Sequence, residues 1–506
     1  MEKRTLLAIA LSFLVIFFWS KFVYNPAQQP ARQSVAVLDD VPVRQPASQL
    51  LPSSLLPDDE APVKEYAIPG SIVQIIEPMA AIRQVTFDQY KQNSYVLNNG
   101  LYIADQKIIF NKAMPVNDGF SYIYEDSTMR VSKTLITSKH SYIMDLEIKI
   151  ANLSSSSLSI DLPIILGRFD LEKKDGASQR FDDIIVSDQV RTSHPNFKKQ
   201  AVFHEIKFIG MRDQYFCAII QPEFTGYSGF VNKVSDKIYD IGIMSKKLTI
   251  NPGSETIQKF KVYIGPQDTD ALGKINPTWG SIVYFGMFDL VAQVIFGLLK
   301  FLFTIVKNWG IAIILMSILI YLVLFPLSVK QMKSMKEMQV LQPKMEQLRK
   351  QYGNNSKKLN EEMMKLYKEH KVNPLGGCLP MVLQIPIFIS LYQVLSRAIA
   401  LKGASFLWIK DLSEPDRLFK LPFEIPFIGE YFNILPILMA IGMFIQQKMS
   451  SANATVQAAE QQKMMVVIFP IMFGVMFYNV PSGLVMYWFL NSTLMLLYQI
   501  KVMKAK

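Results

Sequence analysis

The chain has 506 residues, half of them hydrophobic, and a formal net charge of +11. Its positive mean hydropathy is typical of a membrane protein rather than a soluble one. The two cysteines give no disulfide framework or metal spacing, and the four histidines are scattered, so the pattern disfavours metal or histidine-based catalysis. We therefore expect no metal and no cofactor.

The excess positive charge is confined to short segments. Basic and acidic residues nearly cancel between residues 26 and 280, and the excess lies at the start, in segment 329–372 and in the tail 501–506. An excess of positive charge in short segments beside apolar runs indicates membrane topology rather than nucleic-acid binding. We expect no specific nucleic-acid partner.

The chain begins with an apolar run, Leu6–Val23, preceded by Lys3 and Arg4. The run is longer than the apolar part of a usual signal peptide, and no small-residue cleavage pattern follows it. We interpret residues 1–24 as an uncleaved transmembrane anchor with a cytoplasmic N-terminus. Residues 25–63 contain seven prolines among small and polar residues, which predicts a disordered linker.

Hydrophobicity of period two dominates residues 64–270. Apolar and charged residues alternate strictly over 144–150, residues 260–264 alternate likewise, and turn clusters stand at 98–100 and 251–253. The pattern predicts a large all-β sandwich. Because it holds no nucleophile elbow or phosphate loop, we expect a scaffold or docking surface rather than an enzyme.

Segment 281–303 is mostly apolar but contains Asp289, Gln293 and Lys300. If this segment crossed the membrane, segment 329–372 would lie outside. That segment carries eleven Lys and Arg against five Glu, which the positive-inside rule disfavours there. We therefore predict that 281–303 is an amphipathic helix in the outer interface.

Five apolar segments follow, and with the anchor they predict six transmembrane helices with both termini in the cytoplasm. Two of them have about 17 residues, or roughly 25 Å of helix against about 30 Å of hydrocarbon, which predicts a locally thinned bilayer. The expected spans are Trp309–Ser328, Cys378–Arg397, Tyr431–Gln447, Met464–Val480 and Gly483–Ile500.

Polar residues inside these spans are the candidate site. If they face inward, they hydrate a path and offer hydrogen bonds to a passing polypeptide. The alternative is ordinary interhelical hydrogen bonding, which we favour for Ser317 and disfavour for Gln384 and Asn491. No set resembles a catalytic triad. Each pair shares one helix face: Ser317 with Tyr321, Gln384 with Tyr392, and Tyr487 with Asn491.

Segment 329–372 predicts a cytoplasmic helical hairpin that turns at 353–355, with Ser356 as the cap of the second arm. Its lysines suit anionic lipid headgroups or ribosomal RNA. Its methionines most simply pack the two arms together, and the alternative is an adaptable surface for apolar client segments. They are Met332, Met335, Met338, Met345, Met363 and Met364.

Short motifs occur in order through the membrane half: Asn308-Trp309-Gly310, Lys371–Cys378, Gln384–Phe388, Trp408–Ser413 and Pro481–Leu484. They resemble the YidC/Oxa/Alb family of membrane protein insertases. The anchor, linker and β-domain are similar to the Gram-negative bacterial form, whose periplasmic domain is a β-supersandwich. The resemblance implies a polytopic α-helical inner-membrane protein with a five-helix insertase core over residues 304–500 and an all-β periplasmic supersandwich domain.

The resemblance also implies a function without enzymatic chemistry. Family members insert and help fold nascent membrane proteins, alone or beside the Sec translocon, through a hydrophilic groove open to cytoplasm and lipid. By position, Ser317, Gln384 and Asn491 fall in that groove. Family members typically carry an arginine where this chain has Tyr321. Further expected partners are the ribosome, targeting factors and membrane lipids, and the short basic tail predicts no long ribosome-binding extension.

Two other classes of protein agree less well with the sequence. A secondary transporter or channel usually shows paired internal repeats with broken helices, and the sequence shows no such symmetry. A membrane-anchored enzyme acting through the β-domain is disfavoured because no catalytic cluster is visible in it.

Overall fold

The structure, a computed structural model, describes residues 62–90, 93–105, 108–116, 118–138, 142–172, 181–188, 191–353, 355–370, 372, 379–425, 428–451 and 456–504. The chain divides between Val283 and Tyr284 into two compact units. The predicted anchor and residues 25–61 of the predicted linker lie outside the described residues, as does Cys378. Those predictions therefore stay predictions.

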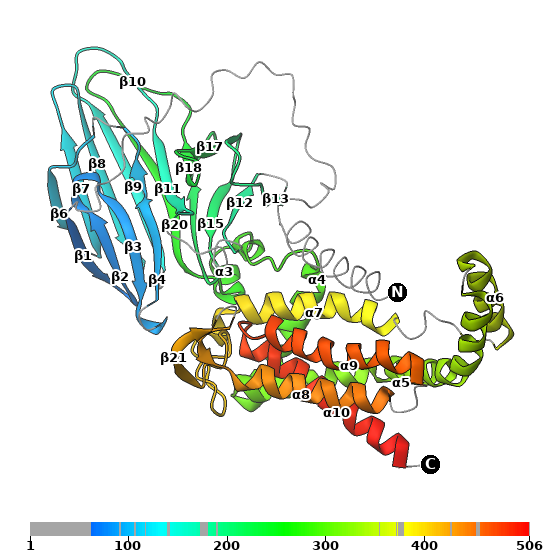
Figure 1. The fold of residues 1–506 in the computed structure, drawn as a ribbon. Helices are drawn as coiled ribbons and strands as arrows, with labels where there is room; N and C mark the ends of the chain where they lie inside the picture. Colours follow the sequence, from blue (N-terminus) through cyan, green and yellow to red (C-terminus); the bar gives the residue numbers. More distant parts are fainter. Residues whose placement is uncertain are drawn as a thin grey trace. The chain divides into compact units, whose positions relative to one another are not determined.

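The first unit is built from antiparallel strands (Figure 1). After the last strand comes a short helix, α3 (Thr269–Ile275). The strands are β1 (Val63–Ile68), β2 (Ser71–Ile76), β3 (Ala81–Phe87), β4 (Ser94–Gly100), β5 (Tyr102–Ile103), β6 (Lys112–Val116), β7 (Gly119–Glu125), β8 (Met129–Thr137), β9 (Ile143–Asn152), β10 (Leu158–Ile160), β11 (Pro163–Asp170), β12 (Asp183–Ser187), β13 (Thr192–Ser193), β14 (Ala201–Phe203), β15 (Phe208–Arg212), β16 (Phe216–Pro222), β17 (Ser228–Lys233), β18 (Ile238–Met244), β19 (Leu248–Ile250) and β20 (Glu255–Pro266).

These strands form a sandwich. One sheet has nine strands in the order β13-β12-β15-β16-β20-β9-β8-β7-β6, and it is opposed by a five-stranded sheet (β14-β17-β18-β11-β5) and a four-stranded sheet (β1-β2-β3-β4). Phe87 stacks on Phe216 with ring centroids 4.7 Å apart, and the Tyr95 hydroxyl donates to the Met211 carbonyl at 3.1 Å. The all-β sandwich predicted from the alternating pattern is confirmed.

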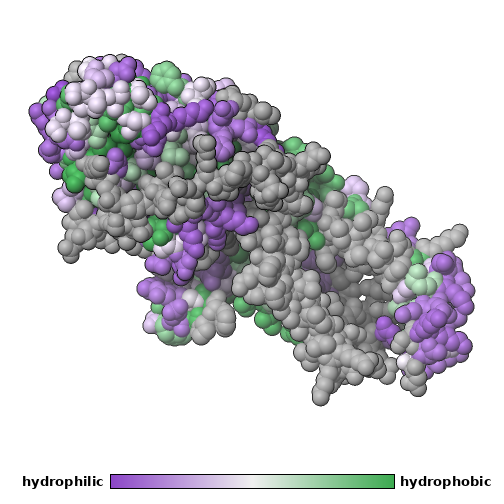
Figure 2. Space-filling model, turned by 90° about the horizontal axis from the view of Figure 1, so that it is seen from above, coloured by the Kyte–Doolittle hydropathy of each residue, from purple (hydrophilic) through white to green (hydrophobic). Residues whose placement is uncertain are grey.

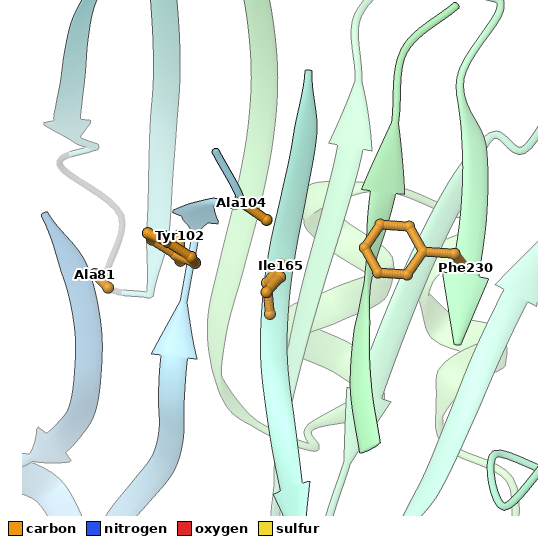
Figure 3. Packing of buried hydrophobic residues seen from close by; sticks show 5 residues of the cluster. All are labelled: Ala81, Tyr102, Ala104, Ile165 and Phe230. Carbon is orange, nitrogen blue, oxygen red and sulfur yellow. The ribbon is translucent and has the colours of Figure 1, made fainter. Parts of the chain in front are cut away.

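The alternation read from the sequence sets the register of the core. In β9, Met144, Leu146, Ile148 and Ile150 are all buried, while the residues between them face outward. Period-two alternation places such residues on one sheet face, and there they lie against the opposing layer. Figure 3 shows another buried cluster, formed within the four- and five-stranded sheets by Ala81, Tyr102, Ala104, Ile165 and Phe230.

The two turn predictions had different outcomes. Residues 251–253 form the turn between β19 and β20, where Gly253 has a φ of +69°. The turn prediction for 98–100 was wrong, because these residues end β4. Asn98 has a φ of +61° and the pairing with β3 shifts register between Ile82 and Gln84, so the asparagine-glycine pattern forms an irregularity within a strand.

Lys133 is a fully buried cation in the core of this unit. The fully buried Lys133 of β8 donates to the carbonyl oxygens of Ala80 at 2.6 Å and Leu101 at 2.5 Å. Both acceptor residues have left-handed backbone, with φ of 47° and 59°. The lysine thus holds the two corners that flank β3 and β4 against β8. Burial lowers the pKa of Lys133 to about 7.

The second unit is a helical bundle with one small hairpin (Figure 1). Helices α5 and α7 to α10 run side by side in it. Its elements are α4 (Asp289–Val306), α5 (Trp309–Tyr352), α6 (Ser356–Glu369), α7 (Leu379–Arg397), β21 (Phe419–Ile425), β22 (Gly429–Phe432), α8 (Ile434–Ser451), α9 (Val456–Met476) and α10 (Ser482–Lys504).

Each of the five predicted C-terminal spans coincides with a described helix, with shifted ends. The first predicted span and the first hairpin arm form one continuous helix, α5, which runs through Pro326 and Pro343. The predicted start of the third span at Tyr431 was wrong, because that residue belongs to β22. Asn355 rather than Ser356 caps α6, since its side-chain oxygen accepts from the Lys358 amide at 3.1 Å.

Length and composition identify the helices that suit a bilayer. Among the described residues, Asp289–Val306, Trp309–Val329 and Ser482–Lys501 are long and apolar enough to cross one. Ile434–Met449 and Val466–Met476 are shorter apolar helices. Helix α4 (Asp289–Val306) is one of the three long apolar segments. Its interfacial position and the total of six spans therefore both stay predictions.

Candidate functional site

Polar side chains of α7 and α10 meet inside the bundle. The Gln384 side-chain amide donates to the Tyr487 hydroxyl at 2.8 Å, which links the two helices. One turn further along α10, the Asn491 side-chain amide donates to the Tyr487 backbone carbonyl at 3.0 Å. The structure therefore brings together three of the residues singled out from the sequence.

A second polar contact joins α5 to α10. The Tyr321 hydroxyl donates to the Leu494 carbonyl at 3.4 Å, three residues beyond Asn491. The Ser317 hydroxyl instead donates to the Ile313 carbonyl of its own helix at 2.6 Å. Helix α10 is thus the shared partner of both polar contacts.

Exposure divides the predicted residues into two groups. Ser317 and Tyr487 are fully buried, each with 0% of its surface exposed. Tyr321, Gln384 and Asn491 are partly exposed. We call these three partly exposed residues the polar face. The polar face is therefore accessible at the surface of the bundle, whereas Ser317 and Tyr487 are not. Tyr392, also partly exposed, lies two turns from Gln384 on α7.

The loops at one end of the bundle are hydrogen-bonded to the start of α10. The Ser482 amide donates to the Glu414 carbonyl at 2.8 Å, and its hydroxyl donates to the Asp411 carbonyl at 3.2 Å. The Gly483 amide donates to the Leu412 carbonyl at 3.0 Å. Two motifs quoted from the sequence, Trp408–Ser413 and Pro481–Leu484, therefore bind each other.

Sequence reasoning missed three buried polar residues at this same end. The Asp416 carboxylate accepts from the amides of Ile434 and Leu435, both at 2.9 Å, and so caps α8. The Asn433 side chain donates to the Tyr478 backbone carbonyl at 2.7 Å. The Asn433 backbone amide donates to the Tyr478 hydroxyl. The signal that could have found them is the position of Asp416 and Asn433, which both precede the apolar run that begins at Ile434.

The motif Asn308-Trp309-Gly310 has a packing explanation. The Asn308 side chain caps α5 by accepting from the Ile311 amide at 3.0 Å, and the Trp309 ring stacks on Phe303 with centroids 3.9 Å apart. A Cβ atom on Gly310 would lie 2.1 Å from the Phe406 ring, so only glycine fits there. The motif fixes where α5 starts.

The predicted hairpin of α5 and α6 packs through a small apolar cluster. Met345 belongs to it and lies 3.8 Å from the Tyr367 hydroxyl, which supports the packing interpretation for this methionine. Met363 is partly buried and Met364 is 50% exposed. The side chains of Met332, Met335 and Met338 lie outside the described residues. The cluster contains Leu341, Met345, Leu348, Leu366, Tyr367 and Val372.

The outer surface of this hairpin is strongly hydrophilic (Figure 2). Lys365 pairs with Glu362 at 2.7 Å, and the Lys344 ammonium lies 2.9 Å from the His370 ring. Exposed ion pairs of this kind contribute little to stability.

Together, these observations define a class: a polytopic membrane protein with an all-β extramembrane domain, whose helices hold polar contacts between them. Family models described as 60Kd inner membrane protein and YidC periplasmic domain match residues 301–506 and 121–298. The chain belongs to the YidC family of membrane protein insertases. It is an inner-membrane protein with a periplasmic β-domain, and it is not an enzyme.

Individual relatives support this membership over the whole length. The chain is 31% identical to the membrane protein insertase YidC of Syntrophobacter fumaroxidans, over 98% of both chains. It is 30% identical to the YidC of Legionella pneumophila (strain Lens), over 98% of this chain and 96% of the relative. A crystal structure of an active YidC insertase with its first transmembrane domain resolved aligns with 98% of this chain and 99% of that chain, with 18% identity and a TM-score of 0.40.

Proposed function

We propose that this protein inserts nascent membrane proteins into the bacterial inner membrane and helps them fold, through a hydrophilic groove lined by the polar face. The observation that carries the proposal is the hydrogen bond between Gln384 and Tyr487, which joins polar side chains of the two largely apolar helices α7 and α10. An unsatisfied polar group in hydrocarbon costs several kcal/mol, so polar residues at this depth need a functional reason.

The groove acts by lowering the cost of moving a client's polar flank. Tyr321, Gln384 and Asn491 offer hydrogen bonds and hold water beside it, while Ser317 and Tyr487 support them from behind. The apolar part of α8, Ile434–Met449, spans only about 24 Å at 1.5 Å per residue, against about 30 Å of hydrocarbon. A locally thin bilayer shortens the remaining path.

The hydrogen-bonded loops around Ser482 and Asp416 close the groove on the periplasmic side. Because that end is closed, a client enters from the cytoplasm and leaves sideways into lipid. In this arrangement six transmembrane helices place both termini in the cytoplasm, and the basic hairpin of α5 and α6 lies there too. The helix α4 lies in the periplasmic interface, and residues 1–24 anchor the chain ahead of the linker 25–63.

The hairpin is the first surface that a client or its carrier meets. Its exposed Met364 offers a flexible apolar contact, and its lysines suit the ribosome, targeting factors or anionic lipid headgroups. We include Met332, Met335, Met338 and Met363 in this client-contact surface. The protein acts alone or beside the Sec translocon.

Reconstitution tests the function. The purified protein is placed in liposomes, a small client with one or two spans is synthesised beside them, and the fraction of client protected from protease is measured. Protection well above that of empty liposomes is expected. Protection equal to that of empty liposomes contradicts the function itself.

The polar face is tested in the same liposomes with the double variant Gln384→Leu and Asn491→Leu. We expect insertion to fall while the protein stays folded, because leucine restores an apolar surface. Normal insertion by a folded double variant contradicts the role of the polar face and leaves the insertase function standing.

A further inference from the structure

A small β-hairpin of β21 and β22 lies between α7 and α8, at the end of the bundle where α8 begins (Figure 1). Its base is firmly attached to that helix. The Leu418 amide donates to the Phe432 carbonyl at 2.9 Å, and the Arg417 amide donates to the Asn433 side chain at 2.9 Å. Because Asp416 also caps α8, the hairpin has a fixed position relative to the start of that helix.

The hairpin is amphipathic. Every second residue of β21 is apolar (Phe419, Leu421, Phe423 and Ile425), and the pairing with β22 shifts register between Lys420 and Ile425. Phe432 of β22 extends this apolar set, since its ring stacks on Phe419 with centroids 4.9 Å apart. We call these five residues the apolar hairpin face.

The charged side chains of the hairpin are electrically balanced. Lys420 pairs with Glu430 at 2.8 Å, and the Arg417 guanidinium lies 5.3 Å from the Tyr431 ring centroid. From residue 417 to 432 the chain carries two basic and two acidic residues, so the hairpin has no net charge. Charge attraction therefore gives it no preference for an anionic partner.

Two phenylalanines of the apolar hairpin face are exposed, whereas Leu421, Ile425 and Phe432 are partly buried. Phe419 is 51% exposed and Phe423, near the tip, is 63% exposed. An isolated two-stranded hairpin is at best marginally stable in water, because it cannot bury one face by itself. A contiguous apolar surface of this kind indicates an interaction site.

The position of the hairpin favours lipid as the occupant. Its base adjoins α8, whose outward stripe of Ile437, Ile441 and Ile445 is 36–50% exposed and repeats every fourth residue. In a membrane helix that stripe contacts acyl chains, so the helix start lies at the membrane–water boundary. The neighbouring Trp408 and Tyr431 are side chains typical of that boundary.

We propose that the apolar hairpin face is embedded in the lipid headgroup region of the leaflet at this end of the bundle. The phenylalanines reach the upper acyl chains, and the Lys420 face points to water. The hairpin thereby fixes the height of α8 in the bilayer. The proposal rests on α8 crossing the membrane and not on client insertion, so it survives a failed insertion assay.

The test places a spin label on either face of the hairpin in the full chain. Phe423→Cys and Glu424→Cys are made in a background with Cys217→Ala and Cys378→Ala, labelled with a nitroxide and reconstituted in phosphatidylcholine nanodiscs. Collisions with oxygen, which concentrates in lipid, are compared with collisions with a water-soluble nickel chelate. Asp236→Cys, on an exposed turn of the β-domain, supplies the aqueous reference.

We expect the label at 423 to collide more with oxygen than with nickel, and the label at 424 to show the reverse. The pattern should persist in high salt, since the hairpin carries no net charge. A label at 423 that matches the aqueous reference overturns the proposal. A label at 423 that is immobile and shielded from both reagents also overturns it, because protein then covers the face.

A milder variant guards against misfolding of the labelled proteins. Phe423→Trp keeps a large aromatic ring on the apolar hairpin face. Lipids brominated near the headgroup should quench its added fluorescence relative to the parent protein. Absence of added quenching contradicts the lipid contact.

Discussion

Replacing Gln384 separates a client-contact role from simple helix packing. Gln384→Leu removes the donor of the 2.8 Å bond to the buried Tyr487 hydroxyl. Interhelical hydrogen bonds in membrane proteins contribute about 0.6 kcal/mol on average and at most about 1.7 kcal/mol. Because Tyr487 is fully buried, we expect a stability loss of about 1–2 kcal/mol.

That loss leaves the protein folded. Against a typical stability of roughly 5–15 kcal/mol, losing about 2 kcal/mol changes the folded fraction by about one percent at most. A severalfold fall in client insertion therefore cannot come from unfolding. It has to come from the missing polar group at the surface of α7.

Tyr487→Phe is the matched control. It breaks the same hydrogen bond but leaves the partly exposed amide of Gln384 in place. We expect the two variants to lose similar stability in a denaturant titration, and a double-mutant cycle to show coupling of about 1 kcal/mol. Only Gln384→Leu should lower client protection in proteoliposomes. Equal insertion losses in both variants would refute the polar-face role and leave the bond as helix packing.

Three further predictions concern other parts of the chain. Tyr321→Arg restores a cation to the polar face, so insertion of acidic clients in proteoliposomes should rise; an unchanged client range would show that the charge is dispensable. Gly310→Ala places a methyl group 2.1 Å from Phe406, so it should lower the melting temperature and cost roughly 1–3 kcal/mol of stability. The control Gly297→Ala, whose methyl group would have no atom within 4 Å, should not lower the melting temperature. Equal shifts in melting temperature for the two variants would contradict this prediction. The folded pKa of Lys133 is about 7 against 10.5 when unfolded, so the unfolded chain binds more protons between these values and stability rises with pH. Hydrogen-exchange protection of β8 should grow by about 2 kcal/mol from pH 7 to 9, and Lys133→Met should remove this slope. An unchanged slope would exclude Lys133 as its source.

Periodic patterns made most of the fold predictable from the sequence. The strict alternation over 144–150 gave both the strand and its buried face, because period two leaves no other way to bury those residues. Long apolar runs located the bundle helices for a similar reason. The tight turn at 251–253 was also predictable, since its glycine needs positive φ.

Features that depend on tertiary contacts were not predictable. Asn98 and the following residues look like a turn locally, but pairing with β3 keeps them in a strand. The hairpin of β21 and β22 was missed, because its short amphipathic strands adjoin an apolar run that hides the boundary at Ile434. The residues of the polar face were predictable one by one, but their grouping was not. Only the structure pairs Gln384 with Tyr487 and leaves Ser317 buried.

Site-specific photocrosslinking during insertion tests the central claim most directly. A photoreactive residue is placed at Gln384 or Asn491, and a stalled nascent client is captured on illumination; Leu290, 80% exposed on α4, serves as the control position. The account predicts strong crosslinks from 384 and 491 and weak ones from 290. Crosslinks of equal strength from all three positions, or none from 384 and 491, would contradict passage of the client along the polar face.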